Sequence, residues 1–351
     1  MTDLQGCIER LGTDDEAERI YAAEDIGYAN EGDGVEPLLR RLTEEPSRAV
    51  REAIFGALLQ IEDDGVIEGA ISLLDSEDCF LRNQAVELLR ARGGQAIPFL
   101  QAAFSKGNSD RRKFVIDVVG ELGEAASSEI YELALIDSDL NVVITAVESL
   151  GHTRKTAFRE QVERLLAPGA HPMLLCACFE ALVQIGSPAS VDAVRTRLGP
   201  GQELAAYLLP SYLKLIGARG SADDVGEIAA MIVREGLEAP VVNALTALRN
   251  RHRGMALPEC LLEPLRTIAT RNGSPLHSYQ AIRLLSVFLG DADVFRFMTG
   301  FLKHPEKALR IGAVQALREA GGERADAVLS ESLADEEDSE ILQAWRGKNG
   351  E

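Results

Sequence analysis

Apolar residues recur along the chain in a pattern that repeats about every 31 residues. Each repeat contains a leucine, isoleucine or valine, here termed the anchor, that follows four residues after a second small or apolar residue. Successive anchors lie 30 to 37 residues apart. A regular period in this range indicates a solenoid of stacked supersecondary units. The anchors are Ile26, Leu58, Leu89, Val119, Leu150, Leu182, Leu213, Leu248, Leu285 and Leu317.

Each repeat holds two helical patterns separated by turn residues, as the second repeat illustrates. Residues 34–42 have apolar residues at helical spacing, and Pro37 lies in the first turn, where proline is tolerated. Ser47 is an N-cap candidate for a second helix over residues 48–61, whose apolar residues share one face. Further first helices are predicted at 96–104, 128–135, 158–166, 190–198, 225–233, 261–269, 294–302 and 325–333.

The two ends of the chain are predicted to cap the stack. Residues 3–11 form an unpaired opening helix, and residues 341–346 form a short closing helix that contains Trp345. A solenoid needs such caps because its terminal core faces would otherwise meet water. These patterns together predict an all-α protein whose residues 1–351 form a single solenoid.

Several second helices share a sequence motif that begins with an apolar residue followed by arginine. The motif reads Val-Arg-Glu-Ala-Ile-Phe-Gly-Ala-Leu over residues 50–58 and Leu-Arg-Ile-Gly-Ala-Val-Gln-Ala-Leu over residues 309–317. It resembles the short HEAT repeats of the bacterial type first associated with phycobilisome lyases, and the resemblance covers nearly the whole chain. It implies a right-handed α-α superhelix of the HEAT or armadillo type, with about ten helix pairs plus end caps. Such scaffolds host many functions, so the resemblance specifies fold far more than activity.

The arginine seven residues before the anchor recurs as a ladder. It is present at Arg19, Arg51, Arg82, Arg112 and Arg310, and it is replaced at Val143, Leu175, Ala206, Val241 and Ser278. One interpretation is a row of anion-binding groups. The favoured interpretation is a set of braces that hold acidic turns or the next helix by charge-assisted hydrogen bonds.

A second ladder, two residues before the anchor, is acidic from the third to the sixth repeat. Its members are Glu87, Asp117, Glu148 and Glu180. In repeats of the type that this chain resembles, the second helix lines the concave face, so these carboxylates would form an acidic stripe there. A partner protein with a basic surface or a basic helix would suit the stripe. The alternative is that glutamate is simply a good helix former on a solvated face.

A basic cluster, Arg249, Arg251 and Arg253, stands out in an otherwise acidic sequence. It ends a second helix where the anchor spacing lengthens to 35 and then 37 residues. The added turn material could form a docking loop, or it could be an irregular joint with solvated charges. Pro210 is predicted to lie inside the preceding second helix and to bend it. Residues 205–290 are therefore predicted to form an irregular seam in the solenoid.

Charge and composition narrow the choice of partner and compartment. The formal net charge of −20 should repel nucleic acid and anionic membranes. The N-terminal residues are polar and acidic, unlike a signal peptide. The five cysteines follow no disulfide or zinc spacing and are interpreted as buried thiols. We expect a cytoplasmic monomer that binds neither nucleic acid nor a membrane.

The sequence contains no recognisable catalytic constellation. None of the five histidines stands at metal-ligand spacing with another ligand, and no His-Glu dipeptide occurs. That absence argues against the HEAT-like deoxyhypusine hydroxylases, which use His-Glu motifs. Neither a glycine-rich phosphate loop nor a nucleophile elbow is found. We therefore predict no catalytic residue, no metal site and no cofactor.

The sequence favours a non-enzymatic scaffold or adaptor that binds another protein. The acidic stripe would be its main surface, and the 249–253 cluster a second contact. Two alternatives stay open. One is a lyase-like or chaperone-like protein acting on a tetrapyrrole or its carrier protein, as the resemblance suggests. The other is a regulatory subunit in bacterial signalling.

Overall fold

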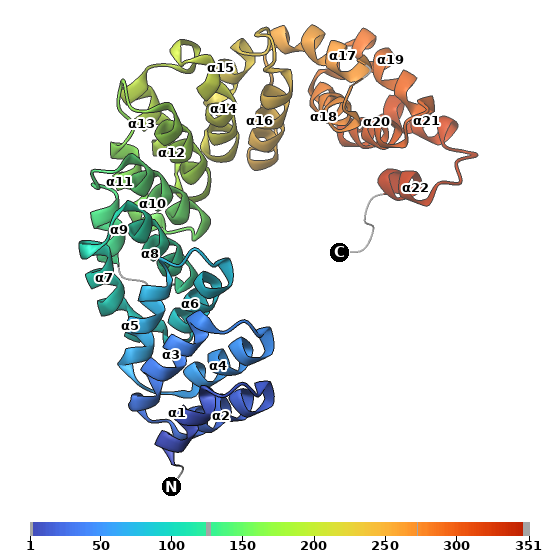
Figure 1. Cartoon of the computed structure of the whole chain (residues 1–351). Helices are drawn as coiled ribbons and strands as arrows, with labels where there is room; N and C mark the ends of the chain where they lie inside the picture. Colours follow the sequence, from blue (N-terminus) through green and yellow to red (C-terminus); the bar gives the residue numbers. More distant parts are fainter. Residues whose placement is uncertain (1–2, 124–127, 272, 347–351) are drawn as a thin grey trace. The chain divides into compact units, whose positions relative to one another are not determined.

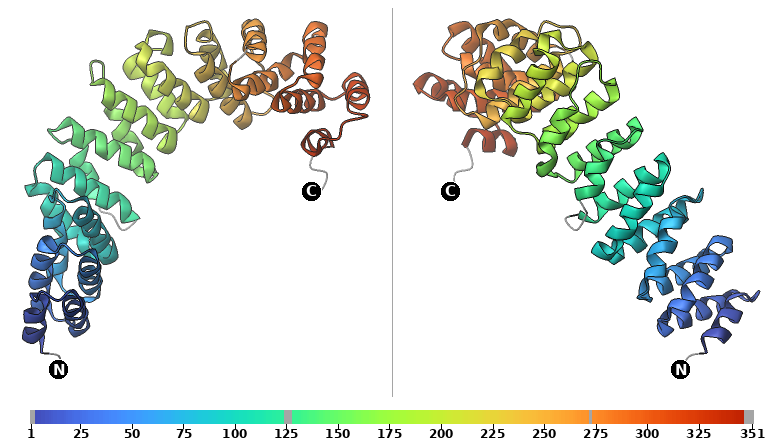
Figure 2. Two further views of the ribbon diagram at one scale, coloured as in Figure 1. Left: turned by 45° about the vertical axis from the view of Figure 1, so that its right-hand side comes forward. Right: turned by 90° about the vertical axis from the view of Figure 1, so that its left-hand side faces the viewer.

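A computed structural model describes residues 3–123, 128–271 and 273–346, and within these ranges all regular structure is helical. The chain divides into two compact units, which are described separately: unit 1 comprises residues 1–154 and unit 2 residues 155–351. In each unit the helices alternate between two layers (Figures 1 and 2). Odd-numbered helices are the first helices of the repeats, and even-numbered helices are the second helices. Within each unit, consecutive second helices pack against one another.

The described residues of unit 1 form five helix pairs. The first helices are α1 (Leu4–Leu11), α3 (Val35–Glu44), α5 (Asp64–Leu73), α7 (Ile97–Lys106) and α9 (Ser128–Ala134). The second helices are α2 (Glu16–Ala29), α4 (Arg48–Gln60), α6 (Cys79–Arg92), α8 (Ser109–Glu121) and α10 (Leu140–His152). The 3₁₀ helices η1 (Gly32–Gly34) and η2 (Gly93–Ala96) lead into α3 and α7.

Unit 2 continues the alternation. The first helices are α11 (Arg159–Arg164), α13 (Pro188–Leu198), α15 (Val225–Ala230), α17 (Leu262–Thr270), α19 (Ala292–Gly300) and α21 (Glu323–Ser332). The second helices are α12 (Pro172–Ile185), α14 (Leu209–Arg219), α16 (Glu238–Arg251), α18 (Pro275–Leu285), α20 (Lys307–Ala320) and α22 (Ser339–Arg346). The 3₁₀ helices are η4 (Thr156–Phe158), η5 (Gly201–Glu203), η6 (Ala206–Leu208), η7 (Ala222–Asp224), η8 (Glu259–Leu261), η9 (Ser286–Phe288) and η10 (Phe301–Lys303).

The anchors form the spine of the core in both units. All ten have 0 % exposure, and the residues four positions before them are also buried. Burying an aliphatic side chain of this size contributes roughly 1.5–3 kcal/mol. The apolar residues that recur along the sequence are therefore the ones that the fold buries. The predicted repeat is confirmed.

The N-terminal ends of the second helices follow from local turn chemistry. In unit 1 the side chain of Ser47 accepts a hydrogen bond from the backbone N–H of Val50, as predicted, and the carboxylates of Asp15, Asp78 and Asp139 cap their helices in the same way. Such caps satisfy backbone donors that would otherwise lack a partner. The N-terminal boundary of each second helix of unit 1 is thus encoded within a few residues.

The predicted bend at Pro210 is wrong. Helix α14 begins at Leu209, so Pro210 lies in its first turn, where a missing N–H costs nothing. The preceding residues form the separate 3₁₀ helix η6. Two first helices are also shorter than predicted, since α11 and α15 each contain six residues.

The opening helix is not an unpaired cap, because α1 packs against α2 as the first member of a pair. At the other end α22 packs against α20, in line with its predicted closing role. The prediction that all the cysteines are buried is wrong. Cys7 and Cys178 are buried, but Cys79 and Cys260 are exposed because they lie in or next to turns.

The arginine ladder consists of structural braces. Arg19 donates to both carboxylate oxygens of Glu45, at 2.9 and 3.1 Å, and to the carbonyl oxygen of Thr13 at 3.1 Å. Arg51 donates to the carbonyl oxygen of Glu45 and, at 2.8 Å, to the carboxylate of Asp78. Similar contacts to a preceding turn join Arg82 to Ser76, Arg112 to Gly107 and Arg310 to His304. The bracing interpretation is confirmed, since these guanidinium groups are used within the fold.

Among the described residues, every helix is too short or too polar to cross a bilayer.

Candidate functional site

Two concavities of opposite charge open on the second helices, one in each unit. The acidic concavity, in unit 1, lies along α6, α8 and α10. The arginine pocket, in unit 2, lies along α16, α18 and α20. Part of each lining lies two residues before or after an anchor, on the side of the helix opposite the buried spine.

The acidic concavity has a volume of about 540 Å³. Three carboxylates line it, those of Asp117, Glu121 and Glu148. Loss of hydration against the surrounding helices raises the pKa of Asp117; the charges of Glu148 and Glu121 add to this rise, and Lys113 opposes it. Ionisation of Asp117 in this concavity is therefore unfavourable, and a bound cation would make it less so. The remaining lining residues are Val86, Gly120, Thr145, Ser149, His152 and Thr153.

The predicted acidic stripe is only partly assembled around this concavity. Asp117 and Glu148 line it together. Glu87 is exposed on α6, where it forms an ion pair with Arg90 at 3.6 Å, one turn further along. Three of the predicted carboxylates thus lie on neighbouring second helices of unit 1, and their role in binding stays a prediction.

Glu180, the fourth member of the predicted stripe, lies on α12 in unit 2. Its carboxylate accepts a hydrogen bond from the hydroxyl of Ser211 at 3.2 Å and forms an ion pair with Lys214 on α14. This carboxylate is paired directly with a cation, whereas Lys113 acts on Asp117 without forming an ion pair with it in the described part of the chain. Any contribution of Glu180 to partner binding would have to compete with Lys214.

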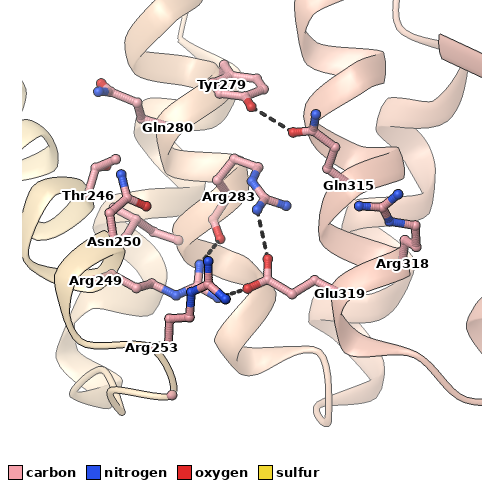
Figure 3. Close-up of a pocket in the computed structure, with 12 residues that line it drawn as sticks. Thr246, Arg249, Asn250, Arg253, Tyr279, Gln280, Arg283, Gln315, Arg318 and Glu319 are labelled. Carbon is pink, nitrogen blue, oxygen red and sulfur yellow. Dashed lines mark hydrogen bonds and ion pairs between the residues drawn. The ribbon is translucent and has the colours of Figure 1, made fainter. Parts of the chain in front are cut away.

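The arginine pocket is the larger concavity, with a volume of about 750 Å³ (Figure 3). Four arginines line it, and Glu319 is its one acidic lining residue among those described. The arginines are Arg249 and Arg253 at the end of α16, Arg283 on α18 and Arg318 on α20. The other lining residues are Thr246, Asn250, Gly254, Tyr279, Gln280, Leu284 and Gln315.

Uneven helix packing explains why a pocket opens at this point. Helices α14 and α16 approach closely, because a Cβ on Gly217 would lie 2.8 Å from the Cα of Ala244. Helices α18 and α20 are similarly close, because a Cβ on Gly312 would lie 2.9 Å from the ring of Tyr279. Between these two pairs, α16 and α18 pack less extensively. The longer connection between them, from Leu248 to Leu285, accommodates that separation.

Glu319 forms ion pairs with two of the arginines (Figure 3). Its Oε1 lies 3.0 Å from Nη2 of Arg249, and its Oε2 lies 2.8 Å from Nη2 of Arg283. Arg249 also donates to the carbonyl oxygen of Arg283 and, at 3.0 Å, to the hydroxyl of Ser286. Burial lowers the pKa of Arg249, and the neighbouring charge of Arg283 lowers it further, while Glu319 opposes both. Arg249 therefore caps the C-terminal end of α18, where a cation is favoured.

The predicted basic cluster divides between two places. Arg249 and Arg253 line the pocket, whereas Arg251 is outside the lining and donates to the carbonyl oxygen of Gly217 at 3.3 Å. Sequence reasoning did not assign Arg283 and Arg318 to a site. A signal for Arg283 was present, since it is the one cation among the residues two positions before the anchors. Arg318 lies in no ladder, and nothing in its local sequence marks it.

Within the described ranges, no group of three or more histidine, cysteine, aspartate or glutamate side chains is placed to hold a metal ion. The two concavities offer charge and hydrogen-bonding groups, which suit the binding of a charged partner.

The family model for HEAT repeats matches residues 4–90 and 262–346, one segment near each end of the chain. No curated protein matches the sequence. Among solved structures, the chain is similar to importin beta in an ammonium sulfate condition (TM-score 0.56, 13% identity) and in a polyethylene glycol condition (0.58, 12%). Each alignment covers 97% of this chain but only 56% and 58% of the importin beta chains. An engineered protein aligns over 99% of this chain and 98% of its own, with 17% identity and a TM-score of 0.47.

The match to the HEAT-repeat model, the likeness to importin beta and the alternating helices place the fold among the α-α solenoids with HEAT repeats. The predicted fold class is confirmed. At 12–13% identity the likeness to importin beta extends to the fold alone.

Proposed function

We propose that this protein is a non-enzymatic scaffold or adaptor that binds another protein through its second helices. The observation that carries the proposal is the exposure of charged concavities on these helices, in register with the buried anchors. Solenoids with this fold commonly serve as protein-interaction surfaces, because stacked repeats present an extended face without needing a single active centre. The arrangement of charges on that face then selects the partner.

The chemistry of unit 1 favours a partner with a basic surface or a basic helix. Asp117, Glu121 and Glu148 share one concavity, and Glu87 extends the negative charge along α6. Burial is the main cause of the raised pKa of Asp117, and repulsion from Glu148 and Glu121 adds to it; a lysine or arginine side chain placed between these carboxylates would relieve that repulsion. We further propose that the protein is a cytoplasmic monomer of the short bacterial HEAT type, and that neither nucleic acid nor a membrane is its partner.

The experiment compares two triple variants with the same change in charge. The test variant is Glu87→Lys, Asp117→Lys and Glu148→Lys on the second helices. The control variant is Glu36→Lys, Glu68→Lys and Glu132→Lys, all exposed on first helices of unit 1. Each is immobilised and exposed to lysate of the native organism, and captured proteins are identified by mass spectrometry.

The proposal expects a protein with a basic segment to be captured by the wild type and the control but lost with the test variant. Equal capture by both variants, with both still folded by circular dichroism, would exclude the second helices of unit 1 as the binding surface. Glu180→Lys, made alone, should have a smaller effect because Lys214 already neutralises that carboxylate.

A further inference from the structure

The arginine pocket of unit 2 carries an excess of positive charge that the fold does not neutralise. Of its four arginines, two share the single carboxylate of Glu319. Within the described part of the chain, Arg253 and Arg318 make neither a hydrogen bond nor an ion pair. The protein has a formal charge of −20, so its overall composition does not account for a pocket with net positive charge. Like charges placed together repel one another, so an arrangement of this kind calls for an anion.

The same pocket contains buried polar atoms with unmet hydrogen bonds. Nη1 of Arg283, Oγ1 of Thr246 and Oε1 of Gln280 are each buried without a partner among the described residues. All three residues line the pocket. A buried polar group without a partner typically costs about 1–3 kcal/mol, so three around one cavity indicate that something else supplies their partners.

Glu319 shows what kind of group fits. Its two oxygens are each within 3.0 Å of a guanidinium nitrogen, one from α16 and one from α18. The pocket therefore already holds one carboxylate between two helices. Nη1 of Arg283 is left over and can donate to a second anionic oxygen, and Arg253 and Arg318 are available at the rim.

The buried atoms that lack a hydrogen-bond partner also limit the chemical class of the ligand. Arg283 needs an acceptor, whereas the oxygen of Gln280 needs a donor. An acidic peptide offers both, because it combines carboxylates with backbone N–H groups. A phosphate offers oxygens chiefly, so it satisfies the arginines but is a poorer source of the donor that Gln280 needs. A volume of about 750 Å³ is large enough for side chains of a short segment.

We propose that the arginine pocket binds an acidic segment of another protein, with carboxylates held by Arg283, Arg253 and Arg318 and a backbone N–H donated to Gln280. This inference extends the proposed scaffold function by giving unit 2 a ligand of opposite charge to that of unit 1. It does not depend on the acidic concavity, so either proposal can fail without the other.

The test is the binding of a fluorescein-labelled peptide of alternating glutamate and glycine, measured by fluorescence anisotropy with the full-length protein at low ionic strength. A peptide with glutamine in place of glutamate is the ligand control. Arg283→Gln and Arg318→Gln should each weaken binding of the glutamate peptide roughly tenfold, because each removes a charge-assisted hydrogen bond. Arg296→Gln is the matched protein control: Arg296 is 78 % exposed on the first helix α19 and should leave the affinity unchanged.

Glu319→Gln separates a binding role from a structural one. It removes the internal carboxylate that competes for Arg249 and Arg283, so it should strengthen peptide binding severalfold even if it lowers the melting temperature. A purely structural network predicts weaker binding instead. Gln280→Ala should weaken the binding of the peptide but not the binding of inorganic phosphate, because only the peptide supplies the N–H donor.

Three results would overturn the proposal. The first is an Arg296→Gln variant that loses as much affinity as Arg283→Gln, which would mean general charge attraction. The second is inorganic phosphate, or a DNA oligonucleotide, that binds with the same dependence on Arg283 and displaces the peptide at matched charge. The third is a glutamine peptide that binds as tightly as the glutamate peptide.

Discussion

Units 1 and 2 use one helical repeat to present very different charge. Unit 1 contains 31 acidic and 14 basic residues, a net charge of −17, whereas unit 2 contains 25 and 22, a net charge of −3. The anchors are equally buried in both. The comparison shows that the core and the exposed side of a second helix are chosen independently, because they lie on opposite sides of the same helix.

The two units also differ in how their turns are held. Four of the five ladder arginines lie in unit 1, where Arg19, Arg51 and Arg112 each join a turn to an acidic residue of the next repeat. In unit 2, Arg195 of α13 instead donates to Asp224 at 2.6 Å and to Glu227 at 3.0 Å. Glu227 in turn accepts from the hydroxyl of Tyr212 at 2.9 Å. Arg195 thus connects the first helices α13 and α15, and Tyr212 joins this network to the second helix α14.

The largest expected effect tests the bracing of unit 1. The side chain of Glu45 has 0 % exposure and accepts from Arg19, Arg41 and the backbone of Ser47. Glu45→Ala should lower the free energy of unfolding by about 3–5 kcal/mol, because it leaves a buried guanidinium without its counter-charge. Urea unfolding followed by circular dichroism measures this. Glu52→Ala, which removes an exposed ion pair with Arg48, should change the free energy of unfolding by less than about 1 kcal/mol.

The next prediction asks whether the cores of the two units are equivalent. Leu89→Ala in unit 1 and Leu248→Ala in unit 2 should each cost about 2–5 kcal/mol, because both remove a fully buried leucine. Chemical denaturation of the two variants supplies the comparison. A cost below about 1 kcal/mol in unit 2 alone would contradict the claim that the divergent repeats keep the same spine.

A pH experiment sharpens the difference in charge. The folded-state pKa of Asp117 is raised above its ordinary value. Below that ordinary value the group is protonated whether the chain is folded or unfolded, so it costs nothing. As the pH rises through the raised pKa, ionisation penalises the folded state. At neutral pH the Asp117→Asn variant should therefore have a higher melting temperature than the wild type. This difference in melting temperature should disappear at acid pH.

Thermal unfolding at several pH values checks this prediction. Glu52→Gln, an exposed carboxyl outside the concavity, serves as its control. A difference between Asp117→Asn and the wild type that stays constant across the acid range would show that the effect is not one of ionisation.

The smallest expected effect concerns thiol exposure. Cys79 in unit 1 and Cys260 in unit 2 are exposed and should react rapidly with a thiol reagent. Burial raises the pKa of Cys178 to about 12, so this thiol should react only when α12 opens, and Cys7 should be slow for the same lack of access. Mass spectrometry of timed labelling reports each site. Rapid labelling of Cys178 in the folded protein would show that unit 2 is less closely packed than its buried anchors indicate.

The sequence predicted the fold well because its signals are local. An anchor and its partner four residues earlier lie on one helical face, and a capping residue such as Ser47 acts within three residues. Pro210 is the instructive failure. Its effect depends on where the helix begins, and η6 takes up the residues before it, so the proline starts α14 instead of bending it.

The sites were harder to predict because they combine distant segments. Arg249 and Arg253 were marked because they belong to a basic cluster in an acidic sequence. Asp117 and Glu148 were marked because each lies two residues before an anchor. Arg318 and Gln280 carried no comparable signal, since a single polar residue on a helix is ordinary. Their significance arises only where α18 and α20 meet the separated end of α16.

The sequence by itself determined the period, the buried spine and the alternation of first and second helices, because each follows from spacing within one or two turns of a helix. The tertiary structure decided which charges share a concavity. That outcome depends on the separation between helices that are 30 or more residues apart in sequence. Close packing at Gly217 and Gly312, with looser packing between α16 and α18, turned four scattered arginines into one pocket.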